Sequence, residues 1–127
     1  MAILGLGTDI VEIERIRAQL ERGGERLARR VLTEAELARF AASAQPERYL
    51  AKRFAAKEAA AKALGTGIGR GVSFQHIETD NNADGAPVLS FSGGAAERLA
   101  AMGGNRIHLS IADERHYAVA TVILSRD

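Results

Sequence analysis

The pattern of apolar and polar positions predicts a chain in which strands and helices are interleaved. Residues 2–11 combine branched apolar side chains with two glycines, which is typical of a strand that another backbone or a ligand approaches closely. Residues 12–30 carry apolar side chains at helical spacing, and the pair Gly23-Gly24 divides this stretch into two short helices. The segment 33–36 (TEAE) matches a capping box and opens a third helix that runs through Phe40.

The longest predicted helix runs from Pro46 to Leu64, because Pro is favoured in a first helical turn and Gly65 supplies a stop. Beyond it we expect strands at 73–79 and 87–91 joined by a turn at 81–85, a helix at 94–102, and strands at 106–112 and 117–124. Since the order does not alternate strictly, we predict an α+β fold, with a mainly antiparallel sheet and helices packed on one face. A length of 127 residues predicts a single domain over 1–127.

Composition narrows the possible chemistry and partners. The chain has no Cys, which excludes thiolate metal sites and disulfides and favours a reducing cytoplasmic location. No apolar run approaches the ~20 residues of a membrane span, so no membrane partner is expected. The formal net charge of +1 does not indicate nucleic-acid binding. An acidic partner is nevertheless suggested, because arginines gather near the N-terminus at positions 15, 17, 22, 26, 29 and 30.

Lys57 is out of place in the predicted long helix. At 100° per residue, Leu50, Phe54 and Leu64 form an apolar stripe, and Lys57 falls inside it. One interpretation is that the stem of Lys57 lies along the apolar surface while its ammonium reaches water. The other is that Lys57 joins neighbouring cations around a phosphate ligand.

Glu58, at the edge of this stripe, also has two interpretations. Glu58 and Lys62 could form an i,i+4 surface ion pair, which stabilises a helix by about 0.2–0.5 kcal/mol. Alternatively, Glu58 binds a metal that bridges to phosphate, since Mg²⁺ takes one or two protein carboxylates and fills its other positions with phosphate oxygens and water. Asp9 would be the second carboxylate, because an Asp in an apolar strand is expensive to bury unless it is paired or metal-bound. Its alternative is to cap the helix that begins near Glu12.

The glycine-dense segment 65–71 (GTGIGRG) follows the long helix. It lacks the Gly-Lys-Ser/Thr ending of a phosphate-binding Walker loop, and it stands at the wrong end of a helix to bind anions through the helix dipole. We expect this segment to end the helix and to form a loop whose main chain could approach a ligand closely. No Ser/His/Asp set has a glycine elbow, so acyl-enzyme chemistry has no support.

Three segments together resemble the holo-[acyl-carrier-protein] synthase family of small 4′-phosphopantetheinyl transferases. They are GLGTDIVEI at 5–13 followed by Arg15-Ile16, RFAAKEA at 53–59, and KALGTG at 62–67. The closing region, HLSI at 108–111 through AVA at 118–120, resembles the last hairpin of that family. The resemblance covers essentially the whole chain, in order.

This resemblance implies the 4′-phosphopantetheinyl transferase fold and Mg²⁺-dependent transfer of the phosphopantetheine arm of coenzyme A to a serine of apo acyl carrier protein, in fatty acid biosynthesis. It implies that Asp9 and Glu58 ligate Mg²⁺ and that a homotrimer has active sites between its subunits. Glu58 and Lys62 would be catalytic, with Glu58 a candidate base acting through water. Coenzyme A would be surrounded by Arg53, Lys57, Lys62, Gly65, Thr66 and Gly67.

Acyl carrier proteins are strongly acidic, so Arg15 and Arg22 become candidate docking contacts, against the alternative of a solvated face. The chain departs from the family at Asp113, where many relatives have a histidine, and His116 cannot be assumed to replace it. Two other functions stay open: a non-catalytic coenzyme A or nucleotide-binding module, and a basic adaptor for acidic proteins. Neither needs two metal-binding carboxylates.

Overall fold

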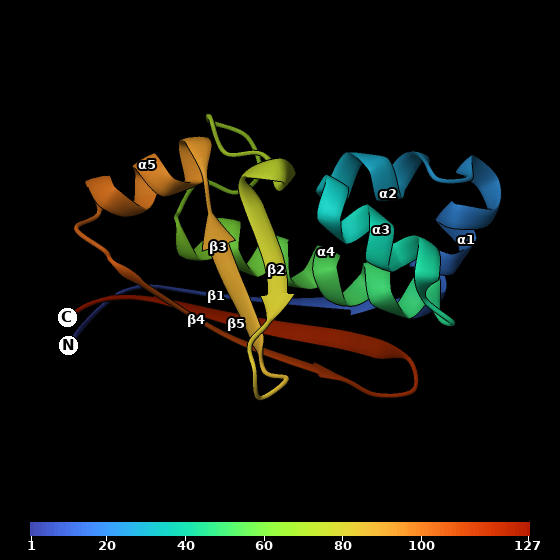
Figure 1. Cartoon of the computed structure of the whole chain (residues 1–127). Coiled ribbons are helices and arrows are strands. Elements are labelled where there is room, and N and C mark those ends of the chain that lie inside the picture. Colours follow the sequence, from blue (N-terminus) through green and yellow to red (C-terminus); the bar gives the residue numbers. More distant parts are fainter.

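A computed structural model describes residues 1–127, and a three-stranded antiparallel sheet forms its base (Figure 1). Strand β5 (Tyr117–Arg126) lies between β1 (Ala2–Glu12) and β4 (Arg106–Asp113). Pairing of β1 with β5 runs from Ala2 opposite Arg126 to Glu12 opposite Tyr117. The two chain ends therefore lie side by side at one end of the sheet.

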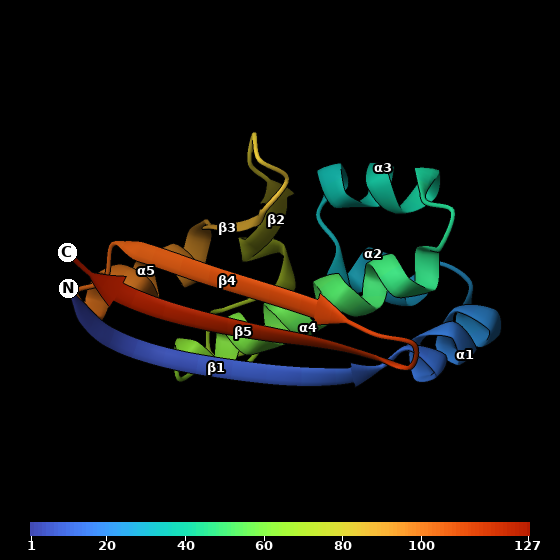
Figure 2. The same cartoon turned by 90° about the horizontal axis from the view of Figure 1, so that it is seen from below.

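Helix α4 (Pro46–Ala63) covers one face of this sheet, as the view from below in Figure 2 shows. In β5 the alternate residues Ala118, Ala120, Val122 and Leu124 are fully buried in the core beneath the helices. Strand β1 approaches α4 through glycine: a Cβ on Gly5 would lie 2.2 Å from the Ala63 carbonyl oxygen, and one on Gly7 would lie 2.0 Å from that of Ala59. The main chain of β1 therefore rests directly on the main chain of α4.

Three helices form an arm at one end of α4: α1 (Ile13–Gly23), α2 (Arg26–Val31) and α3 (Glu34–Ala42). Ile13 and Ile16 of α1 are buried in the core. The predicted capping box of α3 is confirmed, because Thr33 Oγ1 accepts from the Glu36 amide and Glu36 Oε1 accepts from the Thr33 amide.

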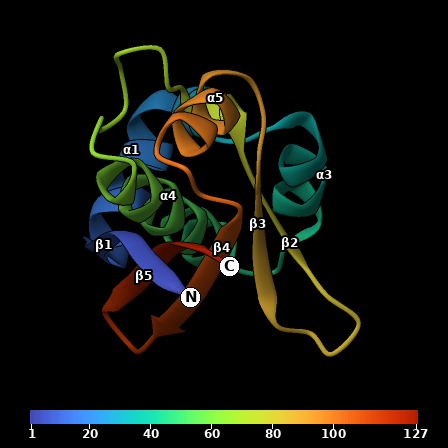
Figure 3. The same cartoon turned by 90° about the vertical axis from the view of Figure 1, so that its left-hand side faces the viewer.

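A second, two-stranded sheet stands beside the first, and its turn projects away from it (Figure 3). It consists of β2 (Ile77–Asn81) and β3 (Pro87–Phe91), and α5 (Gly93–Ala101) follows it. The predicted strand at 73–79 is wrong in its first half, where Phe74–His76 forms a 3₁₀ turn. The amide of Ser73 donates to Nδ1 of His76 at 3.1 Å, so a local side-chain contact closes a turn.

The fold class is confirmed as α+β with helices on one face of the larger sheet. The opposite face of that sheet has no cover within the chain. On β1 it exposes Ile3, Leu6 and Ile10 by 60%, 66% and 62%. No helix is both long and apolar enough to cross a membrane.

Candidate functional site

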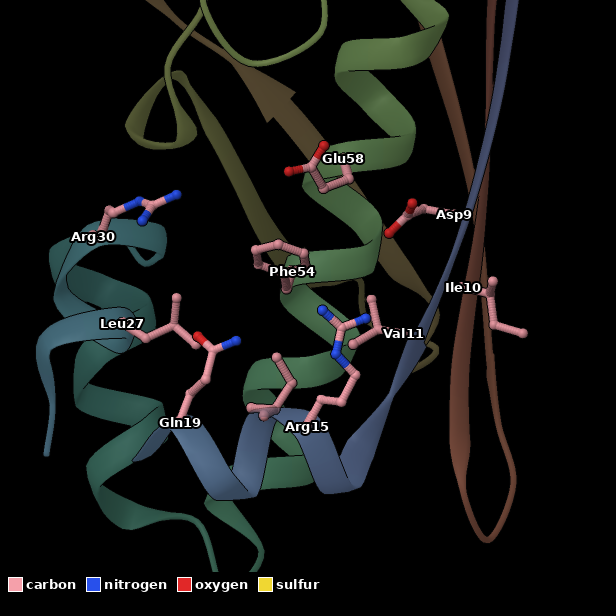
Figure 4. A pocket seen from close by; sticks show the side chains of 10 residues that line it. Asp9, Ile10, Val11, Arg15, Gln19, Leu27, Arg30, Phe54 and Glu58 are labelled. Carbon is pink, nitrogen blue, oxygen red and sulfur yellow. The ribbon is translucent and has the colours of Figure 1, made fainter. Parts of the chain in front are cut away.

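Helices α1, α2 and α4 enclose a cavity of about 410 Å³ with the end of β1 (Figure 4). Asp9 and Glu58 lie near one another at one end of it, as Figure 4 shows, and Arg15 and Gln19 lie toward the other. The complete lining is Asp9, Ile10, Val11, Arg15, Ile16, Gln19, Leu27, Arg30, Phe54 and Glu58. The structure therefore brings together the two carboxylates that were expected to bind a metal.

Asp9 reaches this cavity because of the alternation of β1. Gly7, Asp9 and Val11 share the strand face that packs on α4. The Lys62 ammonium donates to Asp9 Oδ1 at 2.9 Å and to the Thr8 carbonyl at 3.0 Å. Asp9 does not cap α1, whose N-cap is Glu12 without a side-chain hydrogen bond. Lys62 pairs with Asp9 rather than with Glu58, so the surface-pair interpretation of Glu58 is also wrong.

Glu58 lies on α4 one turn after Phe54 and is only partly exposed. Burial raises the pKa of its carboxyl above the ordinary value, and the neighbouring charge of Asp9 raises it further. Lys62 and Arg30 act in the opposite direction and lower the pKa of Glu58. The Asp9 and Glu58 carboxylates together form a local site for a cation.

The donors at this end of the cavity suit Mg²⁺. No group of three or more His, Cys, Asp or Glu side chains is gathered anywhere in the chain, so a site made wholly of protein ligands is absent. Asp9 and Glu58 match the one or two hard oxygen ligands that Mg²⁺ usually takes from protein, and phosphate and water would fill the other positions.

The structure corrects both interpretations of Lys57. Its side chain is fully buried, so the ammonium does not reach water. Its three N–H groups donate to Glu36 Oε1 at 2.6 Å, to the Val31 carbonyl at 2.7 Å and to the Phe74 carbonyl at 3.1 Å. No donor is left for a phosphate of coenzyme A.

The ion pair of Lys57 and Glu36 shifts the pKa of both groups. Burial lowers the pKa of the Lys57 ammonium, and the charge of Glu36 offsets part of this effect. Burial acts to raise the pKa of Glu36, but the Lys57 charge and the hydrogen bonds outweigh it, so the pKa lies below the ordinary value. Glu36 was assigned from the sequence only to a helix cap, and its role as the partner of Lys57 was missed.

Arg53 lies away from the cavity of Asp9 and Glu58. Its guanidinium stacks on the Tyr49 ring at 4.7 Å, and its buried Nε has no hydrogen-bond partner. The buried hydroxyl of Tyr49 also lacks a partner. Both line a separate cavity of about 160 Å³ with Arg48 and Lys52, and the two cavities share no residue. Within one chain, Arg53 and Glu58 therefore do not face the same space.

The loop at Gly65, Thr66 and Gly67 ends α4 as expected. Gly65 and Gly67 have φ of +78° and +64°, values that favour glycine. The Gly65 amide donates to the Lys62 carbonyl, and the Thr66 and Gly67 amides both donate to that of Ala61. These amides close the helix, so any contact of this loop with coenzyme A would come from its other atoms.

The two candidate docking arginines lie along one side of the arm. Arg15 lines the first cavity, and Arg22 lines an adjoining one of about 280 Å³. Gln19, Leu27 and Arg30 line both. The sequence places Arg30 only within a basic cluster, because nothing in it indicates that α2 folds back over Glu58.

Asp113 belongs to a different cluster at the turn between β4 and β5. Its carboxylate is 2.9 Å from Arg48 and 3.7 Å from Lys52, both on α4. Arg48 also donates to the carbonyls of Glu114 and Arg115. Asp113 therefore fastens this turn to the start of α4.

Known proteins share both the sequence and the fold. The 4′-phosphopantetheinyl transferase superfamily matches residues 5–122. A holo-[acyl-carrier-protein] synthase of Shewanella amazonensis is 73% identical over 124 residues, covering 98% of this chain and 99% of that protein.

Two solved structures extend the comparison. The holo-[acyl-carrier-protein] synthase of Neisseria meningitidis superposes with a TM-score of 0.91 at 42% identity, covering 98% of this chain and 99% of that one. That of Bacillus anthracis, in complex with CoA (3′,5′-ADP), has a TM-score of 0.81 at 38% identity, with 100% of both chains covered. The chain thus belongs to the 4′-phosphopantetheinyl transferase superfamily, and the relatives it matches there are holo-[acyl-carrier-protein] synthases.

Proposed function

We propose that this chain transfers the 4′-phosphopantetheine moiety of coenzyme A to a serine of apo acyl carrier protein, in support of fatty acid biosynthesis. The products are holo acyl carrier protein and adenosine 3′,5′-bisphosphate. The observation that carries the proposal is the meeting of Asp9 and Glu58 in one cavity, in a chain 73% identical to a holo-[acyl-carrier-protein] synthase. A binding module or an adaptor would have no need of this carboxylate pair.

In the proposed reaction, the serine oxygen bonds to the phosphorus that carries the pantetheine arm. The bond from that phosphorus to the oxygen of adenosine 3′,5′-bisphosphate breaks. Asp9 and Glu58 would hold Mg²⁺, which when bound offsets the charge on the phosphate oxygens. Glu58, acting through a water molecule, is the candidate acceptor of the serine proton.

Lys62 is proposed to assist the departing phosphate. Its side chain is 51% exposed, so its ammonium can turn from Asp9 toward a phosphate oxygen. Arg53 and the loop at Gly65, Thr66 and Gly67 are proposed to contact coenzyme A elsewhere. Lys57 is omitted because its donors are occupied.

We further propose a homotrimer with active sites between its subunits. Two observations support it. Ile3, Leu6 and Ile10 leave the sheet with an exposed apolar face. The cationic cavity of Arg53 is separate from that of Glu58, an arrangement that suits a site to which two chains contribute.

Mass spectrometry of apo acyl carrier protein tests the proposed function directly. After incubation with the protein, coenzyme A and Mg²⁺, the carrier should gain the mass of one phosphopantetheine group. Replacing its acceptor serine with alanine should abolish the gain. An unmodified carrier in the complete reaction would contradict the proposal.

A further inference from the structure

A buried ion pair lies directly behind the candidate site. Lys57 is the residue before Glu58 on α4, and neither Lys57 nor its partner Glu36 has any exposed side-chain surface. The three acceptors of the ammonium come from three segments: Glu36 from α3, the Val31 carbonyl from the end of α2, and the Phe74 carbonyl from the 3₁₀ turn.

Glu36 extends the network to β2. Its Oε1 accepts from Lys57 and from the Thr33 amide, while Oε2 accepts from the amide and the hydroxyl of Thr79 at 2.7 and 2.8 Å. The network is thus fully hydrogen-bonded. Buried ion pairs seldom stabilise a fold more than apolar side chains of the same size would, so stability alone does not account for this one.

The location of the pair points to another role. Val31 ends α2, the helix whose Leu27 and Arg30 line the cavity across from Phe54 and Glu58. The Lys57 ammonium holds the Val31 carbonyl, and the backbone of Lys57 leads directly into Glu58. The α2 wall of the cavity is therefore tied to the residue that precedes Glu58.

We infer that Lys57 and Glu36 are positioning residues, which set the α2 wall of the site against Glu58 without touching either substrate. This inference rests on the proposed transferase function. Asp9, Lys62 and Glu58 lie on β1 and α4, whose contact is made by Gly5 and Gly7 and does not involve the pair. Loss of the pair should thus disturb the wall formed by α2 and leave the carboxylates in place.

The test is the double variant Glu36→Gln/Lys57→Met, which removes both charges and avoids leaving one buried alone. Catalytic efficiency toward the carrier should fall on the order of 10- to 100-fold, because small misplacements of a site wall cost this much. The KM for coenzyme A and the affinity for Mn²⁺, measured by electron paramagnetic resonance, should stay within about twofold of the wild-type values.

The control is Arg39→Met/Asp80→Asn, which removes an exposed ion pair that also joins α3 to β2. It should leave all three quantities unchanged. Thermal unfolding followed by circular dichroism identifies an assay temperature at which every variant is folded. A wild-type catalytic efficiency toward the carrier in the folded double variant would show that the pair has a purely structural role. A selective rise in the KM for coenzyme A would instead indicate that Lys57 contacts a phosphate of coenzyme A. Either result overturns the inference, whereas failure of the proposed function would leave the wild-type protein inactive.

Discussion

The Lys62 ammonium lies 2.9 Å from the Asp9 carboxylate, although the two residues are separated in sequence by the end of β1, the entire helical arm and most of α4. Asp9 is thereby paired with Lys62, whereas no other side chain forms a hydrogen bond with the Glu58 carboxylate. A cation that binds between the two carboxylates would release Lys62 for contact with a phosphate.

Asp9→Ala and Glu58→Ala should each reduce carrier modification by at least about 10²- to 10³-fold, because each removes a proposed ligand of the Mg²⁺ that would offset the phosphate charge. Circular dichroism should show that both variants stay folded. Glu97→Ala, at an exposed carboxylate on α5, is the control and should retain full activity. Full Mg²⁺-dependent turnover in either site variant would contradict the metal assignment.

Arg15→Glu should weaken carrier binding on the order of tenfold while leaving coenzyme A binding unchanged, because it reverses a charge that we propose contacts the acidic partner. Titration calorimetry with each substrate separates the two affinities. Arg126→Glu makes the same charge change at the end of β5 and should have no effect. If Arg15→Glu and Arg126→Glu bind the carrier with equal affinity, Arg15 is a solvated side chain and not a docking contact.

Leu6→Glu should dissociate the proposed trimer, because it places a charge on the uncovered face of the sheet. Sedimentation velocity should show a trimer for the wild-type protein and a monomer for this variant. Val88→Glu alters an exposed apolar residue of the other sheet and should leave the assembly intact. A monomeric wild-type protein would refute the proposed assembly.

Gly7→Ala should lower the free energy of unfolding by about 1–3 kcal/mol or more, because its Cβ would meet a main-chain oxygen that cannot turn aside. Urea unfolding measures the change. Gly23→Ala, at the end of α1, has no neighbour closer than 3.9 Å to the new Cβ and should be neutral or stabilising by up to about 1 kcal/mol. Similar stabilities for both variants would argue against the close approach of β1 to α4.

Acid should weaken the protein through Glu36. Because its folded pKa is lowered, its contribution is present above the unfolded value of about 4.3 and is lost as the pH falls through the folded value. The free energy of unfolding of the wild-type protein should decline over this range more steeply than that of Glu36→Gln/Lys57→Met. Parallel pH profiles from urea unfolding would show that the pair does not contribute to acid sensitivity.

Local signals in the sequence were sufficient for most elements but not for the contacts between them. Pro46 and Gly65 bracket α4, and the capping box at Thr33 marks the start of α3. Helical geometry alone identified Lys57 as anomalous. Its partner Glu36 could not be identified, because one carboxylate serves both the helix cap and the ion pair, and a separation of 21 residues in sequence does not reveal a tertiary contact.

The candidate site also shows that individual residues could be predicted from the sequence, whereas contacts between elements could not. Asp9 and Glu58 were predicted as metal ligands mainly from resemblance, and the structure places both in one cavity. Arg53 was grouped with them because it lies near Glu58 on α4, yet it lines another cavity. Proximity along a helix does not specify which neighbouring segment a side chain meets, since that depends on how the remaining elements pack.

The contact of Gly5 and Gly7 with α4 also bears on how the site responds to heat. Side chains in a core exchange rotamers, and a spacing set by them varies as they do. Here Asp9 is spaced from α4 by main-chain atoms, which have no rotamers to exchange. The main-chain positions that carry Asp9 and Glu58 should consequently keep their separation as the temperature rises, until the strand itself detaches from the helix.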